Sequence, residues 1–292
     1  MNELKVAGVH FHSNYLRKEN NLKRMSELCR DAGDHGVNLL LFPELTVTGF
    51  VLGDDVYGAA EQIPGPSSDA LCTMAGKYNL YICAGMVERH HGLNYNAMVL
   101  AGPDGIVGKY RKVHLPFVEY PSYTAGGKFN VFELFGWKVG IATCCDNLFS
   151  EQFRILAIRG AEIILSPFCW LYESDDSRPL VFKKEPPFKE INGWIKSHMK
   201  KLLPARVYEN GVYLMAVNQY GPIGTNDYYA SGGVVMFGPD GDLIAENTRG
   251  PYKDEIITAV FTRMDLDAWR ARGNFSLKLR RPELYGAIRK SR

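Results

Sequence analysis

The chain has 292 residues, of which 46% are hydrophobic and 23% are charged, and its 34 basic and 32 acidic side chains leave a formal net charge of +2. A chain of this length and composition can bury a large core without crosslinks. The balanced charge argues against partners such as nucleic acid or an anionic membrane surface. The N-terminus enters a strand-like run at once, unlike a signal peptide, and no apolar run approaches the length of a membrane span.

Six cysteines are present: Cys29, Cys72, Cys83, Cys144, Cys145 and Cys169. Most of the six lie in apolar stretches of the sequence. A free cysteine behaves as a small buried hydrophobe, so packing is the default interpretation of each one. The spacing of the cysteines and of the seven histidines matches no metal-ligand pattern, so we expect neither a metal nor a cofactor. The cysteine content fits a reducing compartment, and we expect the cytoplasm.

The first hundred residues alternate between strand-like and helix-like patterns, which favours an α/β architecture. An apolar face with helical spacing marks the first helix, and a nearly continuous apolar run over 37–42 is typical of a strand covered on both faces. The expected elements, in chain order, are a strand at 4–10, a helix at 20–32, a strand at 37–42, a helix at 67–77, and strands at 80–87 and 95–100.

The tetrapeptide Gly-Pro-Asp-Gly occurs twice, at 102–105 and at 238–241, each time between two strand-like runs. Proline presets φ and glycine accepts a positive φ, so both copies predict a β-hairpin. Two similar hairpins in the two halves of the chain suggest related layers of one domain. We therefore expect a single domain over 1–292.

Two segments depart from this pattern. The stretch 171–200 is charged, carries three prolines and has no clear period, and we interpret most of it as a surface loop insertion. Long loops in compact domains are often lids or binding loops, although a decorative insertion is equally compatible with the sequence. The basic segment 280–292 is interpreted as a solvated C-terminal tail.

Three motifs place a charged or reactive side chain at the end of an apolar run. Glu44 follows Leu39–Phe42 and Pro43, and a carboxylate beside a buried strand is costly to desolvate. Glu44 could turn into solvent or cap a backbone amide, or it could be a buried general base. The sequence alone leaves both interpretations open.

The second motif is the basic run around Lys112, which could simply be a surface strand. Strand alternation would place Tyr110, Lys112 and His114 on one face. If that face points into the domain, the ammonium of Lys112 needs a buried carboxylate partner.

The third motif is the strand 137–142, which runs into Thr143 and the sequence Cys144-Cys145-Asp146. A cysteine at a strand end usually serves packing, whereas a thiol beside a basic residue can become a nucleophile. A Gly-x-Ser-x-Gly elbow, a Gly-x-Gly-x-x-Gly loop and a phosphate loop are all missing from the sequence.

In this order, the three motifs resemble the nitrilase, or carbon–nitrogen hydrolase, superfamily. Each motif is weak alone, but the ordered set is specific. Further segments agree along nearly the whole chain, at 205–210, 217–219, 231–233 and 281–285. The resemblance implies a four-layer αββα sandwich and a homodimer or higher homo-oligomer that associates through its outer helices.

The resemblance also assigns roles to individual residues. Glu44 matches the family's base, Lys112 its catalytic lysine and Cys144 its nucleophile, because one residue separates the nucleophile from Asp146 in the family pattern. Glu119 matches a second glutamate that positions the substrate or supports Lys112. The backbone N–H of Cys145 and the ammonium of Lys112 would hold the oxyanion.

The sequence indicates the type of reaction more clearly than the substrate. The expected activity is hydrolysis of a small amide, with N-carbamoyl compounds or nitriles as alternatives and a catalytically silent scaffold as the non-enzymatic one. Two departures from the family pattern lie near the nucleophile: Asn147 replaces the arginine of N-carbamoyl-D-amino acid hydrolases, and Ser150 replaces a proline. The pocket candidates, which could equally serve packing, are Phe50, Tyr123, Asn147, Phe168 and Trp170.

Overall fold

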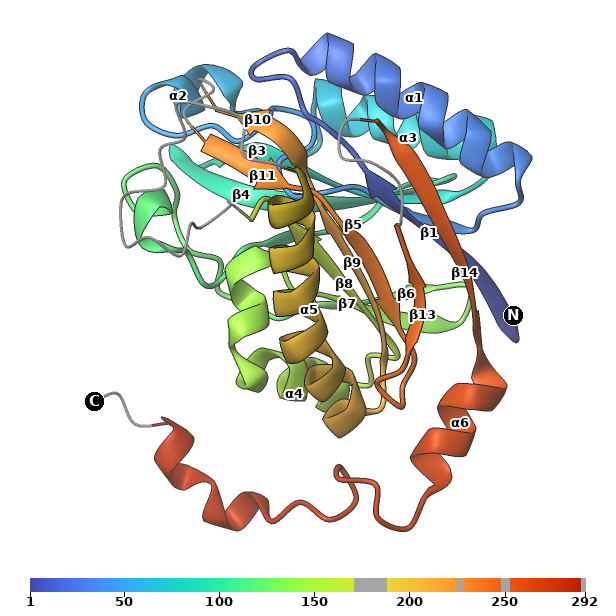
Figure 1. Cartoon of the computed structure of the whole chain (residues 1–292). Coiled ribbons are helices and arrows are strands. Elements are labelled where there is room, and N and C mark those ends of the chain that lie inside the picture. Colours follow the sequence, from blue (N-terminus) through green and yellow to red (C-terminus); the bar gives the residue numbers. More distant parts are fainter. Residues whose placement is uncertain (171–187, 225–227, 248–252, 290–292) are drawn as a thin grey trace.

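A computed structural model describes residues 1–170, 188–224, 228–247 and 253–289, and for 188–198 it describes only the helical backbone. Two six-stranded sheets form the centre of the molecule (Figure 1). The order of the first sheet is β14 (Glu255–Thr262), β1 (Glu3–His10), β2 (Leu39–Leu41), β3 (Tyr81–His90), β4 (Leu93–Gly102) and β5 (Gly105–Arg111). The order of the second is β13 (Leu243–Glu246), β12 (Val234–Phe237), β9 (Tyr213–Asn218), β8 (Ile163–Phe168), β7 (Trp137–Ile141) and β6 (Val131–Leu134).

Helices cover the outer face of each sheet, as Figure 1 shows. Helices α1 (Lys18–Asp34) and α3 (Pro66–Tyr78) lie on the first sheet, and α4 (Ser150–Ile158) and α5 (Phe188–Asn210) lie on the second. The remaining elements are α2 (Asp55–Ala59), α6 (Arg263–Ala271), the ribbon β10 (Tyr220–Ile223) and β11 (Tyr228–Ser231), and the short 3₁₀ turns η1 (Phe117–Glu119), η2 (Cys144–Leu148), η3 (Pro282–Leu284) and η4 (Gly286–Arg289). The expected αββα sandwich is confirmed.

Strand alternation explains how the layers adhere. In β2, Leu39 and Leu41 belong to the core between the two sheets, whereas Leu40 belongs to the core beneath α1 and α3. In β8, Ile163 faces the central core and Ile164 faces the core beneath α4 and α5. Successive side chains of a strand point to opposite faces of the sheet. A strand that is covered on both faces therefore has an unbroken apolar run in its sequence.

The predicted elements agree with the structure, with differences at their ends. Both Gly-Pro-Asp-Gly turns join antiparallel strands, β4 with β5 and β12 with β13. The strand expected over 37–42 is shorter, because only Leu39–Leu41 is extended and paired. Among the described residues, no helix combines the length and the apolar character that a membrane span needs.

The loop expected over 171–200 is wrong in its second part. Residues 188–200 form the first half of α5, which continues to Asn210. Pro186 and Pro187 stand directly before the helix, where proline does not break it, and Pro204 is tolerated inside it. Residues 171–187 lie outside the described part of the chain.

The topology brings several chain segments to one edge of the sandwich. Strand β2 is parallel to β3, and β7 is parallel to β8 and β9. Strand β5 runs in the same direction as β3, because both are antiparallel to β4. A bridge between Phe11 and Gln219 joins the two sheets at this edge. The segments after β2, β5, β7 and β8 therefore converge there.

The turn after β2 crosses β3 at Gly85 with no room for a side chain. A Cβ on Gly85 would overlap the backbone nitrogen of Leu45 and lie 2.8 Å from the carbonyl carbon of Glu44. Gly85 also accepts a hydrogen bond from the N–H of Val47 through its carbonyl. Only glycine permits this close approach, which fixes the path of the chain that carries Glu44 after β2.

We expect Gly85→Ala to lower the free energy of unfolding by roughly 1–3 kcal/mol, because overpacking in a buried site forces backbone shifts. Denaturant titration of the purified variant measures this loss. Gly127→Ala is the matched control, since a Cβ there meets no atom within 4 Å. Equal stability of the two variants would contradict the close approach.

Candidate active site

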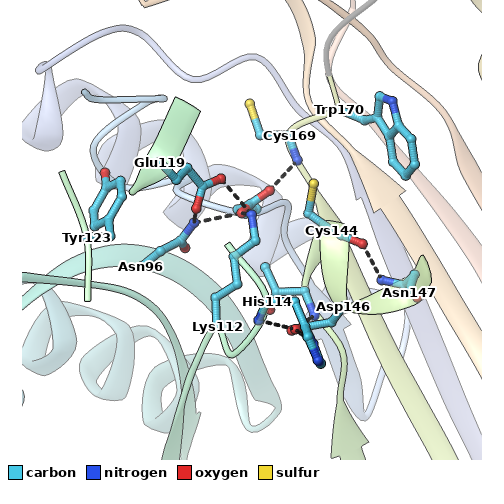
Figure 2. Close-up of polar contacts among 12 residues, drawn as sticks. Asn96, Lys112, His114, Glu119, Tyr123, Cys144, Asp146, Asn147, Cys169 and Trp170 are labelled. Carbon is cyan, nitrogen blue, oxygen red and sulfur yellow. Dashed lines mark hydrogen bonds and ion pairs between the residues drawn. The ribbon is translucent and has the colours of Figure 1, made fainter. Parts of the chain in front are cut away.

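The ammonium of Lys112 lies between two buried carboxylates, as Figure 2 shows. Lys112 follows β5, and its Nζ donates to Oε1 of Glu44 at 2.7 Å and to Oε1 of Glu119 at 2.6 Å. All three side chains are almost completely buried. A buried charge is tolerated when it is paired and hydrogen-bonded, and here one cation serves two anions.

Glu44 has donors on both carboxylate oxygens. The side-chain amide of Asn96 donates to Oε1 at 2.7 Å, and the backbone N–H of Cys169 donates to Oε2 at 2.7 Å. The side-chain amide of Gln219 donates to the backbone carbonyl of Glu44 at 2.6 Å. Glu44 is therefore a fixed buried carboxylate and does not turn into solvent.

Cys144 begins the 3₁₀ turn η2 at the end of β7, and its φ is +49°. A positive φ is rare for a residue with a side chain and has to be held by its surroundings. The side-chain amide of Asn147 donates to the carbonyls of Ala142 and Cys144, at 2.8 and 3.1 Å. Ser166 of β8 donates to the amide oxygen of Asn147 at 2.8 Å and so fixes its orientation.

The carboxylate of Asp146 ties this turn to the segment that carries Lys112. Its Oδ2 accepts from the N–H of Thr143 at 2.9 Å and from the hydroxyl of Tyr110 at 2.7 Å. Its Oδ1 contacts His114 through both the backbone N–H and Nδ1, at 2.9 and 2.8 Å. The segment around Lys112 and the turn around Cys144 therefore share one buried anion.

The thiol of Cys144 lies in the electrostatic field of these groups. Burial raises its pKa well above the ordinary value, the charge of Glu44 raises it further, and Lys112 opposes the shift. The resting sulfur is therefore a thiol that needs a base. Burial alone would lower the pKa of Lys112, but the negative charges of Glu44 and Glu119 hold it well above its ordinary value, so the ammonium stays charged.

Glu119 differs from Glu44 in its surroundings. Burial raises the pKa of Glu119 to about 7, against the attraction of Lys112, and the charge of Glu44 adds to the rise. Two carboxylates around one ammonium titrate as a coupled set. Near neutral pH this set therefore exchanges a proton.

The structure brings together the residues that the motifs singled out. Glu44, Lys112, Glu119 and Cys144 converge, and Cys145 follows Cys144 in the same turn. Asn96 and the backbone of Cys169 were missed. The signal for Asn96 was a polar residue inside the apolar run 95–100, whereas a backbone donor such as Cys169 leaves no mark in a sequence.

The pocket candidates fall into two groups. Phe50 and Tyr123 pack with Cys169 in one apolar cluster, and the hydroxyl of Tyr123 donates to the carbonyl of Val51. Phe168 belongs to the cluster that contains Cys144, with Trp170 packed against it. The polar atoms of Asn147 hold the turn. That these residues line a substrate pocket stays a prediction.

No group of three or more His, Cys, Asp or Glu side chains in the described part of the chain is arranged to hold a metal ion. The chemistry of the site is that of a thiol, a carboxylate and an ammonium in a buried space. This set matches an activated nucleophile with an adjacent base and a fixed cation for a developing negative charge.

Comparisons with known proteins place this chain among hydrolases of one family. The chain is 32% identical over 222 residues to a nitrilase of Pyrococcus abyssi, covering 75% of the chain and 76% of the relative. It is 29% identical over 300 residues to a citrullinase of Francisella tularensis, covering 99% of both. The structure matches an amidase from Nesterenkonia with a TM-score of 0.78 and 23% identity over 98% of this chain and 99% of that one.

The relatives carry names for different substrates, so they agree on the family and leave the substrate open. The family model for carbon–nitrogen hydrolase matches residues 5–271. The chain belongs to the carbon–nitrogen hydrolase family of the nitrilase superfamily.

Proposed function

We propose that this hydrolase is an amidase that cleaves a non-peptide C–N bond of a small amide through a thioester on Cys144. One observation carries the proposal: the thiol of Cys144 lies in the field of the Lys112 ammonium, which two buried carboxylates share. The Nesterenkonia structure shows acrylamide added at that protein's active-site cysteine, which supports a reactive cysteine on this fold. The proposed reaction needs neither a metal nor a cofactor.

In the first half-reaction, Glu44 takes the proton of the Cys144 thiol while the sulfur bonds to the amide carbonyl carbon. The carbonyl π electrons move to the oxygen, and Lys112 and the N–H of Cys145 hold the oxyanion. A fixed donor of this kind in a dry site contributes roughly 3–4 kcal/mol. Glu44 then gives its proton to the nitrogen as the C–N bond breaks, and ammonia or an amine leaves.

In the second half-reaction, Glu44 takes a proton from water as the oxygen attacks the thioester carbon. The tetrahedral species collapses, the C–S bond breaks and the sulfur recovers its proton from Glu44. The product leaves as a carboxylic acid and releases its remaining proton to solvent to become a carboxylate. Glu119 supports Lys112 throughout and orients the substrate.

Other activities use the same residues. Hydrolysis of an N-carbamoyl compound or of a nitrile also begins with sulfur attack on an electrophilic carbon. Simple amides lead, because no feature of the sequence marks nitrile specificity. A catalytically silent scaffold is disfavoured, since Glu44, Lys112 and Cys144 are all present and close together.

We expect the protein to release ammonia from short uncharged amides, and more slowly or not at all from the matching nitriles and N-carbamoyl compounds. Ammonia release over a panel of these three classes, at one concentration and pH, measures the preference. Faster turnover of nitriles or carbamoyl compounds would reassign the substrate class. No release from any class by folded protein would support the silent scaffold.

We expect Cys144→Ala to lower turnover by on the order of 10⁴-fold or more, because the nucleophile and its base act as a unit. Cys145→Ala should retain much of the activity, since only its backbone N–H takes part. Mass spectrometry of the protein after a slow ester substrate should find the acyl group on Cys144. Equal losses in the two variants, or an adduct confined to Cys72 or Cys169, would reject this assignment.

We propose that the protein forms a homodimer through α4 and α5. Apolar side chains are exposed on these helices and on the turn before α4: Leu148, Phe149, Ile158 and Tyr208. Exposed apolar side chains on neighbouring helices are typical of an interaction surface.

The proposal of a cytoplasmic protein rests on the six cysteines, which are all free thiols.

We expect Ile158→Arg to halve the molar mass measured by sedimentation, because an arginine within the proposed apolar interface is costly to bury. Leu93→Arg is the control, since Leu93 on β4 is similarly exposed, 47% against 52% for Ile158. A monomeric wild-type protein, or an unchanged mass for Ile158→Arg, would reject this interface.

A further inference from the structure

The proposed mechanism uses Glu44 as the base but does not explain what keeps a proton shared by the two carboxylates off Glu44. Glu44 and Glu119 share the ammonium of Lys112 at almost equal distances, 2.7 and 2.6 Å. The cation therefore does not distinguish them. When the pair holds one proton, the reaction needs that proton on Glu119, because a protonated Glu44 cannot accept the proton of Cys144.

Asn96 is the residue that treats the two carboxylates differently. Its side-chain amide donates to Oε1 of Glu44 at 2.7 Å but to Oε2 of Glu119 only at 3.4 Å. The hydrogen bond to Glu44 is therefore short, and the one to Glu119 is long and weak. A donor favours the ionised form of the carboxylate it contacts, so Asn96 favours ionised Glu44.

Other contacts of the pair point the same way. Glu44 receives a third donor, the backbone N–H of Cys169, on its second oxygen. Glu119, with fewer strong donors, has a pKa of about 7 because of its burial. The proton that enters the pair near neutral pH therefore goes to Glu119.

The placement of Asn96 is built into the sheet. It lies in β4 opposite Val87 of β3, and its backbone carbonyl accepts the N–H of Lys112 at 2.9 Å. The same residue thus holds Lys112 through its backbone and Glu44 through its side chain. A change of the side chain alone leaves the backbone contact available.

We propose that Asn96 is a positioning residue that directs the proton shared by the two carboxylates to Glu119 and keeps Glu44 ionised and aligned toward Cys144. This role rests on the proposed function. Asn96 contributes the directing contact without adding a charge. A second cation at this position would bind both carboxylates and compete with Lys112.

The test is the pH dependence of Asn96→Leu, which keeps the size of the side chain and removes the donor. Loss of this hydrogen bond should move the acid limb of the kcat/KM profile, the low-pH side on which activity is lost, to higher pH by about one unit. We expect kcat/KM to fall about tenfold at pH 7 and to recover to within about threefold of wild type at pH 9. A structural defect would instead lower kcat/KM by the same factor at every pH.

A matched control is available two residues away on the same face of β4. Asn94→Leu removes another buried amide, one without a hydrogen bond from its side chain to Glu44 or Glu119 in the structure. Its pH profile should match wild type. A displaced profile in Asn94→Leu, or an undisplaced one in Asn96→Leu, would overturn the proposal.

Asn96→Asp provides a second variant if Asn96→Leu does not fold. It has the same shape but offers an acceptor and a negative charge, so the acid limb should move further than in Asn96→Leu. A limb that stays in place, or that moves to lower pH, would equally overturn the role of Asn96.

Alkylation of Cys144 by iodoacetamide tests the same role without turnover. The sulfur displaces iodide from the CH₂ carbon, and the thiol proton passes to Glu44. The alkylation rate, followed by mass spectrometry, should show the same displaced limb in Asn96→Leu. If wild type cleaves no C–N bond but Asn96→Leu still displaces the pH profile of alkylation, only the proposed function fails. If wild type is an active amidase but the profile of Asn96→Leu is not displaced, only this inference fails.

Discussion

The buried ammonium of Lys112 is the constraint on which the site depends. Removing a charge from water costs several kcal/mol unless partners replace the lost hydration, and Lys112 finds them in Glu44 and Glu119. The three residues come from three separate segments, after β2, after β5 and in η1. None of the three charges could be buried alone at comparable cost. The pairing therefore fixes the relative positions of those segments and at the same time creates the field in which the thiol of Cys144 lies.

A further buried carboxylate, that of Asp146, fixes Cys144, the proposed nucleophile, relative to this group. Asp146 accepts from Thr143 and from Tyr110, and so joins the turn at Cys144 to the strand that leads to Lys112. The unusual backbone conformation at Cys144 is held on its other side by Asn147 and Ser166. The turn is thus held by one neutral amide, one hydroxyl and the carboxylate of Asp146. Within the residue ranges that the structure describes, no hydrogen bond or ion pair joins the carboxylate of Asp146 directly to Lys112, Glu44 or Glu119.

The sequence predicts the fold and the candidate site residues for different reasons. Both hairpins followed from turn chemistry, and the strands covered on both sides followed from apolar runs such as 37–42. Glu44, Lys112 and Cys144 were ambiguous one by one, since each has a packing or surface interpretation, and only their order in the chain selected the catalytic one. Asn96 was missed because its partners are distant in sequence and become neighbours only when β4 pairs with β3 and β5. The first half of α5 was missed because charge and nearby prolines obscured its helical character.

The arrangement of charges suits the proposed reaction, because the first step moves charge without creating any. Before attack, Glu44 is ionised and the sulfur carries its proton. After attack, Glu44 is protonated and the negative charge lies on the oxyanion, still beside Lys112. The net charge of the buried group is unchanged, so the low-polarity surroundings, which penalise any new charge, add little to the barrier. To keep the net charge unchanged in this way, Glu44 has to start ionised even when the pair of carboxylates holds a proton. The unequal hydrogen bonds from Asn96 to Glu44 and Glu119 meet that requirement with a neutral group.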